Sequence, residues 1–271
     1  MNAKGERLGS RRVEVSRLRM PMIAQNFSRL EQRRANIGPA TIAYQVAGDG
    51  PPLVLVHGLS GSSRWWRRNI GALTPHWRVY VVDLIGFGAS RTRHPFVLAE
   101  AAGYLAQWLD QLELPRASLV GHSMGGLIAA ELAADAPARV DRLVLVDPAA
   151  LPLSPRLMIH ALSLLRELRT LSPSFLPVLL ADTLRAGPFT MWRAITALML
   201  ADLRPKLAQI CAPTLVIWGE RDALVPLAFA QQLAEHLRYE QLVVIKGAGH
   251  VPMWDRPQEF NRVLIEFLLA D

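Results

Sequence analysis

The segment Ser118–Gly126, with the sequence SLVGHSMGG, constrains the fold of this chain more than any other part of it. A short apolar run stops at Gly121, and an Ala- and Leu-rich helical pattern begins at Met124. Ser123 therefore lies in a G-x-S-x-G motif at a sharp turn from a strand into a helix. The backbone at the tip of such a turn is strained, so the residues two before and two after the serine must be small, as Gly121 and Gly125 are. The turn presents the Ser123 hydroxyl at a helix N-terminus, where backbone N–H groups favour negative charge.

Strand-like and helix-like segments alternate along most of the remaining chain. Short runs rich in Val, Ile and Leu predict strands at residues 40–46, 53–56, 78–82, 118–120, 142–146, 214–218 and 241–245. Helical patterns lie between most of these runs, at residues 64–73, 98–112, 124–135, 226–237 and 257–269. Strands that alternate with helices form a parallel sheet covered on both faces, so the chain is predicted to have an α/β fold.

The alternation stops between Asp147 and Ile210, where no strand-like run occurs. This segment has a helical pattern rich in Leu, Ala and Met, which prolines divide into short pieces. A connection of about sixty residues is far longer than a crossover between neighbouring strands requires. The sequence therefore predicts a helical cap at residues 149–210, inserted into a core formed by residues 36–148 and 211–271.

Charge is distributed unevenly along the chain. Of 271 residues, 51% are apolar, which is enough for one large core, and the net charge is +7. Residues 1–35 carry nine Lys or Arg and three Glu residues, a net +6. Such an arm can contact anionic lipid or nucleic acid, but its lack of sustained apolar periodicity predicts a disordered tail that is dispensable for folding. The nearly neutral remainder predicts no nucleic-acid partner.

The cysteine content and the apolar segments of the chain indicate where in the cell the protein is expected. Cys211 is the single cysteine, which excludes an internal disulfide and favours a cytoplasmic protein. No apolar window is long enough to cross a bilayer, so no membrane span is predicted. The expected partner is a small-molecule substrate, and the sequence carries no signal for an oligomeric state.

The loops that follow two later strands supply partners for Ser123. A serine hydroxyl becomes a good nucleophile when a neighbouring histidine takes its proton and a carboxylate orients that histidine. In strand–turn–helix enzymes of this type the acid and then the histidine follow the serine along the chain. Asp222 follows the strand at 214–218 and His250 follows the strand at 241–245, and the carboxyl ends of parallel strands meet at one edge of a sheet. The predicted catalytic residues are therefore Ser123, Asp222 and His250, with Asp147 as a less favoured acid because Pro148 follows it.

A tetrahedral oxyanion requires two preorganised N–H donors. The backbone of Met124 follows the serine directly, and the backbone of Leu59 lies in a loop after an early strand, so these two groups are the predicted oxyanion hole. His57 and His122 are expected to hydrogen-bond the loops beside the site. The sequence contains no metal cluster, dinucleotide fingerprint or phosphate-binding loop, so no metal and no cofactor is expected.

These motifs resemble those of the α/β-hydrolase superfamily over about residues 36–271. The resemblance lies in His57-Gly58, the D-x-x-G-x-G-x-S run at residues 83–90, the serine motif at residues 121–126, Asp222 with Pro226, and Gly249-His250 before Arg256-Pro257. It implies an α/β-hydrolase fold: a mostly parallel eight-stranded sheet with helices on both faces and a small helical cap. It also implies a serine hydrolase that cleaves an ester or related acyl bond through an acyl-enzyme.

Differences from other branches of the superfamily narrow the activity. Haloalkane dehalogenases and epoxide hydrolases of this fold use an aspartate nucleophile, whereas position 123 is serine. The C–C hydrolases of aromatic-ring degradation usually have Asn before the serine, whereas this chain has His122. Cofactor-free haloperoxidases share the same catalytic residue types. Three alternatives therefore stay open: a haloperoxidase-like perhydrolase, a C–C bond hydrolase, and a non-catalytic ligand-binding protein on the same fold.

The predicted cap is apolar, which favours a small to medium apolar substrate. Its candidate lining residues are Leu157, Met158, Leu162, Phe175, Phe189, Met191 and Trp192. Trp65, Trp192 and Trp254 are the predicted substrate-binding residues, and the candidates for lining the entrance of the site are Trp65, Trp66 and Trp254.

Overall fold

One mixed sheet forms the centre of the computed structural model, which describes residues 30–92, 95–152, 167, 170–237 and 241–270. Eight strands follow one another in the order β1-β2-β4-β3-β6-β7-β8-β9, and a two-residue strand, β5, pairs with β2 beside this path. Their bounds are β1 Glu31–Ile37, β2 Ala40–Ala47, β3 Pro52–Val56, β4 Arg78–Val82, β5 Arg91–Thr92, β6 Ala117–His122, β7 Val140–Val146, β8 Thr214–Gly219 and β9 Gln241–Ile245. All pairs from β4 to β9 are parallel, whereas β2 runs antiparallel to β1, β4 and β5. The predicted mostly parallel sheet is therefore confirmed.

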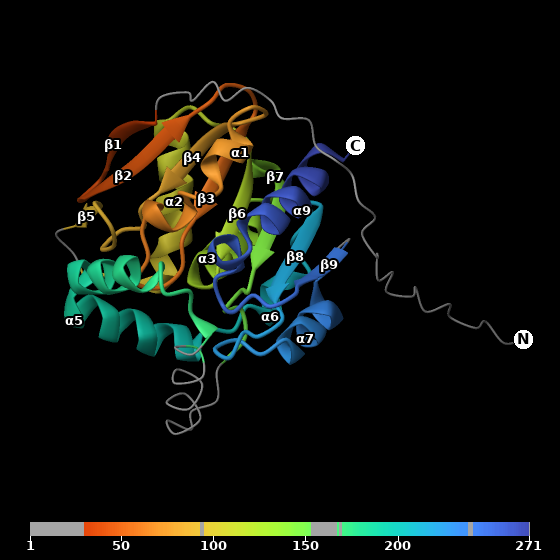
Figure 1. Ribbon diagram of the computed structural model, residues 1–271. Coiled ribbons are helices and arrows are strands. Elements are labelled where there is room, and N and C mark those ends of the chain that lie inside the picture. The colour runs from red at the N-terminus through yellow and green to blue at the C-terminus, as the bar shows by residue number, and fades with distance from the viewer. Residues whose placement is uncertain (1–29, 93–94, 153–166, 168–169, 238–240, 271) are drawn as a thin grey trace, which may run out of the picture.

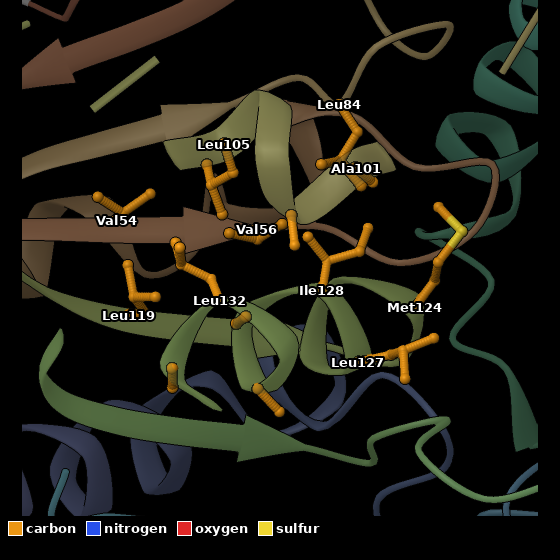
Figure 2. Close-up of a cluster of buried hydrophobic side chains, with 14 of the residues drawn as sticks. Val54, Val56, Leu84, Ala101, Leu105, Leu119, Met124, Leu127, Ile128 and Leu132 are labelled. Carbon is orange, nitrogen blue, oxygen red and sulfur yellow. The ribbon is translucent and has the colours of Figure 1, made fainter. Parts of the chain in front are cut away.

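Helices cover both faces of this sheet. They are η1 Ser63–Trp66, α1 Ile70–Leu73, α2 Leu98–Gln111, α3 Met124–Asp135, η2 Pro137–Arg139, α5 Leu176–Leu200, α6 Arg204–Leu207, α7 Ala228–His236, α8 Pro252–Asp255 and α9 Pro257–Leu269. Successive side chains of a strand point to opposite faces, and β3 follows this rule. Val54 and Val56 belong to a core cluster that includes side chains of α2, α3 and α7, whereas Leu53 and Leu55 belong to a second cluster with side chains of α1 and α9. Figure 2 shows the first of these two cores, with Val54 and Val56 facing side chains of α2 and α3.

The first strand corrects the predicted domain boundary. Residues 31–35 belong to the predicted basic arm, but β1 begins at Glu31 and pairs antiparallel with β2. Sequence periodicity missed it because the side chains of residues 31–34 are exposed and polar, and only Ala35 and Ile37 are buried. Backbone hydrogen bonds hold this edge strand, and charged side chains are common on such edges. The arm is therefore shorter than predicted, and residues 1–29 lie outside the described part of the chain.

Helical segments follow β7, where the sequence predicts a cap. The longest, α5, bends at Gly187, where φ is +78°, and Pro188 follows this bend. Figure 1 shows α5 beyond the edge at which the parallel strands end. In contrast, α6 packs on the core, because Lys206 Nζ donates to Asp135 Oδ2 of α3 at 2.8 Å. The predicted cap, residues 149–210, therefore includes the described residue Glu167 and α5, whereas α6, which the prediction also assigned to the cap, packs on the core. Among the described helices, none has both the length and the apolar content that crossing a bilayer requires.

Candidate active site

Ser123 lies on a strained turn between β6 and α3. Its backbone has φ +51° and ψ −116°, a conformation that side-chain-bearing residues rarely adopt and that is typical of functional turns. The flanking glycines are required by close packing. A Cβ on Gly121 would lie 2.3 Å from the carbonyl oxygen of Gly125, and a Cβ on Gly125 would lie 2.4 Å from the carbonyl oxygen of His57. The turn therefore holds the Ser123 hydroxyl at the N-terminus of α3.

This packing yields a prediction for the glycines. Replacing Gly125 with alanine should prevent folding or lower the free energy of unfolding by more than about 4 kcal/mol, because the clashing atoms are backbone. The matched control is Gly103→Ala in the middle of α2, where the added Cβ meets no atom within 4 Å. That change should raise the free energy of unfolding by about 0.5–1 kcal/mol, the usual gain for this substitution in a helix. Urea denaturation of both variants measures their free energies of unfolding. Equal stabilities of the Gly125→Ala and Gly103→Ala variants would contradict the prediction.

His250 connects Ser123 to Asp222. The Nε2 atom of His250 lies 3.0 Å from Ser123 Oγ, and its Nδ1 atom lies 2.7 Å from Asp222 Oδ2. The other carboxylate oxygen of Asp222 accepts the N–H groups of Leu224 at 2.8 Å and Val225 at 2.9 Å. Both loops begin where β8 and β9 end, as the chain order predicts. The structure thus brings the three predicted catalytic residues into one hydrogen-bonded line, and all three are buried.

The charges around His250 favour its protonated form. Burial lowers the pKa of the imidazole, but the neighbouring carboxylates of Asp222, Glu167 and Asp255 outweigh it, so that the pKa is raised above its usual value. The neighbouring ring of His122 does not oppose this effect with a positive charge, because burial holds the pKa of His122 well below the usual value. A histidine in this setting can take a proton from Ser123 and hold it beside Asp222.

Asp147, the less favoured acid, lies directly behind this line. Its Oδ1 accepts the Gly219 N–H at 2.8 Å, and its buried Oδ2 has no hydrogen-bond partner among the described residues. Burial raises the pKa of Asp147 well above its usual range, and the charge of the neighbouring Asp222 raises it further. Ligand atoms of Asp147, Asp222 and His250 lie within 4.8 Å of one another, but a metal ion there would have to break the contact between His250 Nδ1 and Asp222. The geometry therefore places Asp222, and not Asp147, on His250.

The loop after β3 approaches Ser123 from the other side. A Cβ on Gly58 would lie 3.1 Å from Ser123 Cβ, so a side chain at this position would push the loop away. His57 holds the loop as expected: its Nδ1 donates to the Gly58 carbonyl at 2.7 Å, and its Nε2 accepts the Leu84 N–H at 3.0 Å. Leu59 follows Gly58 directly, so the loop that carries the predicted donor lies beside Ser123.

Two buried carboxylates of the segment between β7 and β8 were not assigned a role from the sequence. Asp182 of α5 accepts the Ser62 hydroxyl at 2.8 Å and the Trp65 indole N–H at 3.1 Å, and it pairs with Arg64. Glu167 accepts the backbone N–H of His250 at 2.8 Å. Both are acids within a largely apolar segment, which is a signal for burial with polar partners, but their partners lie too far away along the chain to be read from the sequence.

The three predicted substrate-binding tryptophans occupy different surroundings. Trp65 is buried, with its ring centroid 5.7 Å from that of His122. Trp254 is fully buried, its indole N–H donates to Ser174 at 3.1 Å, and Arg67 and Arg68 lie over its ring. The placement of Trp254 at an open entrance is therefore wrong, because its ring packs inside the protein. Trp192 is 61% exposed on α5, beside Phe189. Of the other cap candidates, Leu157, Met158 and Leu162 lie outside the described residues.

A sheet of this topology with a serine on a strained strand-to-helix turn defines the α/β-hydrolase class of fold. Residues 53–263 match the model of the Alpha/beta hydrolase family. The chain is 35% identical over 252 residues to a protein of Variovorax paradoxus (strain S110) that is named as a carbamate hydrolase, RutD, and the match covers 83% of this chain and 95% of that protein. It is 30% identical over 250 residues to the pimeloyl-[acyl-carrier protein] methyl ester esterase of Nitrosomonas europaea, covering 82% and 97%.

Solved structures give the same result. The enol-lactonase from Burkholderia xenovorans LB400 superposes with a TM-score of 0.75 at 27% identity, covering 88% of this chain and 100% of that one. The chain therefore belongs to the alpha/beta hydrolase family, and it is a hydrolase. The predictions of family, fold class and enzymatic nature are confirmed.

Proposed function

We propose that the protein is a serine hydrolase that cleaves an ester or a related acyl bond through a covalent acyl-enzyme. The observation that carries this proposal is the line of contacts from Ser123 Oγ to His250 Nε2 at 3.0 Å and from His250 Nδ1 to Asp222 Oδ2 at 2.7 Å. Nucleophile, base and orienting acid lie within hydrogen-bond reach of one another, as activation of a serine requires. The strained turn adds to this, because it holds the hydroxyl at a helix N-terminus.

In the proposed mechanism Ser123 Oγ attacks the substrate carbonyl carbon while His250 Nε2 takes the hydroxyl proton. The backbone N–H groups of Leu59 and Met124 hold the oxyanion of the tetrahedral intermediate. The carbonyl re-forms as the bond to the leaving group breaks, and the His250 imidazolium, held by Asp222, gives its proton to the leaving group. Water then attacks the acyl-enzyme with His250 as base, which releases the acid and restores Ser123.

The substrate class follows from the surroundings and from the relatives. The described part of α5 is rich in apolar side chains, which favours a small to medium apolar acyl or alcohol group. One relative is named a carbamate hydrolase and another a methyl ester esterase. Carbamates and esters share a carbonyl carbon bonded to an oxygen leaving group, and one Ser-His-Asp site can attack either. Trp65, beside His122, is the proposed substrate-contacting tryptophan.

Active-site labelling tests the proposal. A fluorophosphonate probe should modify the protein once, at Ser123 in peptide mass spectrometry. The labelled enzyme should lose all turnover of p-nitrophenyl esters, and short to medium acyl chains should be the best substrates in a panel of increasing length. Absence of labelling and of turnover for every ester and aryl carbamate, with a ligand still bound, would favour a binding protein. Halide oxidation with peroxide, or cleavage of a vinylogous diketone faster than any ester, would instead favour a perhydrolase or a C–C hydrolase.

A further inference from the structure

Glu167 links the segment between β7 and β8 to both loops that carry partners of Ser123. One of its oxygens, Oε1, accepts the backbone N–H of His250 at 2.8 Å. The other, Oε2, accepts the backbone N–H of Ala223, next to Asp222, at 3.1 Å. Glu167 is only 4% exposed, and no Lys or Arg pairs with it among the described residues. A buried carboxylate is costly, so its two backbone donors provide the compensating contacts.

The neighbouring backbone is shaped to admit this carboxylate. A Cβ on Gly249 would lie 2.9 Å from Glu167 Oε1 and 3.1 Å from Thr170 Oγ1, so any larger residue at position 249 would push Glu167 away. The backbone of Glu167 is held in place by two further hydrogen bonds. Its backbone carbonyl oxygen accepts the Leu171 N–H at 2.9 Å and the Thr170 hydroxyl at 3.0 Å. Glycine at position 249 and an acid at position 167 thus fit each other.

Glu167 also completes the contacts around His250. The carbonyl of His250 accepts the Nε2–H of His122 at 2.6 Å, so its backbone is held at both polar atoms. With the side chain held by Ser123 and Asp222, every polar group of His250 has a partner. A displacement of about 1 Å at a reacting group can lower a rate about a hundredfold, so contacts of this kind bear on catalysis.

We propose that Glu167 is a positioning residue: its carboxylate ties the His250 loop to the Asp222 loop and places a negative charge beside the imidazole. This inference rests on the proposed function, in which His250 is the base. It assigns Glu167, a described residue of the segment between β7 and β8, a role in the catalytic apparatus. The described groups near the imidazole are Asp222, Asp147, Glu167 and Asp255 as acids and His122 as a neutral ring.

Three variants at position 167 can separate the effect of the negative charge of Glu167 from the effect of its side-chain length. Glu167→Gln keeps the shape and one acceptor but loses the charge and turns an N–H donor toward Ala223. Glu167→Asp keeps the charge but is too short to reach both loops. Glu167→Ala removes both. The measurement is the second-order rate constant of fluorophosphonate inactivation between pH 5 and 9, together with kcat and KM for a p-nitrophenyl ester.

The expected results differ between the variants. Each should lower the inactivation rate constant and kcat by about 10- to 100-fold with a smaller change in KM. The rate constant rises with pH as His250 loses its proton, so the midpoint reports its pKa. Glu167 raises that pKa, so its loss in the Gln and Ala variants should move the midpoint to lower pH, whereas the Asp variant should keep a midpoint close to that of the wild type. Gly249→Ala, which displaces Glu167 without changing it, should reproduce the loss in rate.

The control is Asp182→Asn, the other buried carboxylate of this segment, which contacts Ser62 and Trp65 but neither His250 nor Asp222. It should lower the melting temperature and leave the pH midpoint unchanged. If the wild type labels at Ser123 but the Gln variant keeps its rate and midpoint, Glu167 has no positioning role. The same holds if Asp182→Asn moves the midpoint equally, because the effect would then be structural. If the wild type does not label, the proposed function itself fails.

Discussion

Replacing Ser123 with alanine should lower kcat by about a million-fold and abolish fluorophosphonate labelling, with no loss of the folded state. The size of the effect follows from the loss of the nucleophile, because the remaining groups of a triad contribute little once the covalent step is removed. Alanine meets the same backbone strain at φ +51° as serine does and removes only the oxygen that contacts His250. Circular dichroism and the melting temperature should therefore match those of the wild type.

A matched control separates this serine from other nucleophiles. Cys211 is an exposed free thiol that precedes the start of β8, whereas Asp222 follows the opposite end of this strand. The Cys211→Ser variant should label and turn over like the wild type. Retention of labelling in the Ser123→Ala variant would remove Ser123 from its proposed role, whichever ester is used.

Replacing Asp222 with asparagine should lower kcat by about ten-thousand-fold, because the amide cannot hold the His250 tautomer that accepts the serine proton. The neighbouring Asp147→Asn variant should remain within a few-fold of the wild type. Burial raises the pKa of Asp147, which disfavours its charged form, and an amide of the same shape keeps an oxygen that accepts the Gly219 N–H. Asparagine also tolerates the φ of +43° at this position.

The Asp147→Asn variant should also differ from the wild type in how its stability depends on pH. The folded-state pKa of Asp147 is raised, so the folded protein holds a proton that the unfolded chain releases. The stabilisation is fully present below the unfolded pKa of about 3.8 and is lost as the pH rises through the folded value. Asp147→Asn should therefore melt higher than the wild type at neutral pH and above, with the difference shrinking on the acid side. Loss of activity in Asp147→Asn with retention in Asp222→Asn would instead make Asp147 the acid partner.

The loops that carry the predicted catalytic residues could be located from the sequence because each of these loops follows a short apolar run. Ser123, Asp222 and His250 follow the ends of the parallel strands β6, β8 and β9, and parallel strands end at one edge of a sheet. This local rule is enough to place three side chains near one another. The glycines at 121 and 125 could likewise be interpreted from their positions around the serine, and the structure gives the reason as contacts with backbone oxygens.

Strand β1 and the positions of the tryptophans depended on long-range packing. The side chains of β1 are mostly exposed, so its place in the sheet comes from backbone hydrogen bonds to β2 and not from apolar periodicity. Trp254 and Trp192 have the same side chain, yet one is fully buried and the other is 61% exposed. A tryptophan is expected to make apolar contacts at either position. The segments that pack around it determine whether its ring is buried or exposed to solvent.

Local pattern therefore placed the strands, the serine turn and the order of acid and histidine along the chain, since these depend on residues a few positions apart. The choice between Asp222 and Asp147 depended instead on which carboxyl group faces His250 Nδ1, and on the burial that raises the pKa of the other. The contacts of Glu167 join residues 56 and 83 positions apart in the chain. Such contacts arise because buried polar groups need hydrogen-bond partners in the folded protein. These partners can lie anywhere along the chain, so they produce no periodic pattern in the sequence.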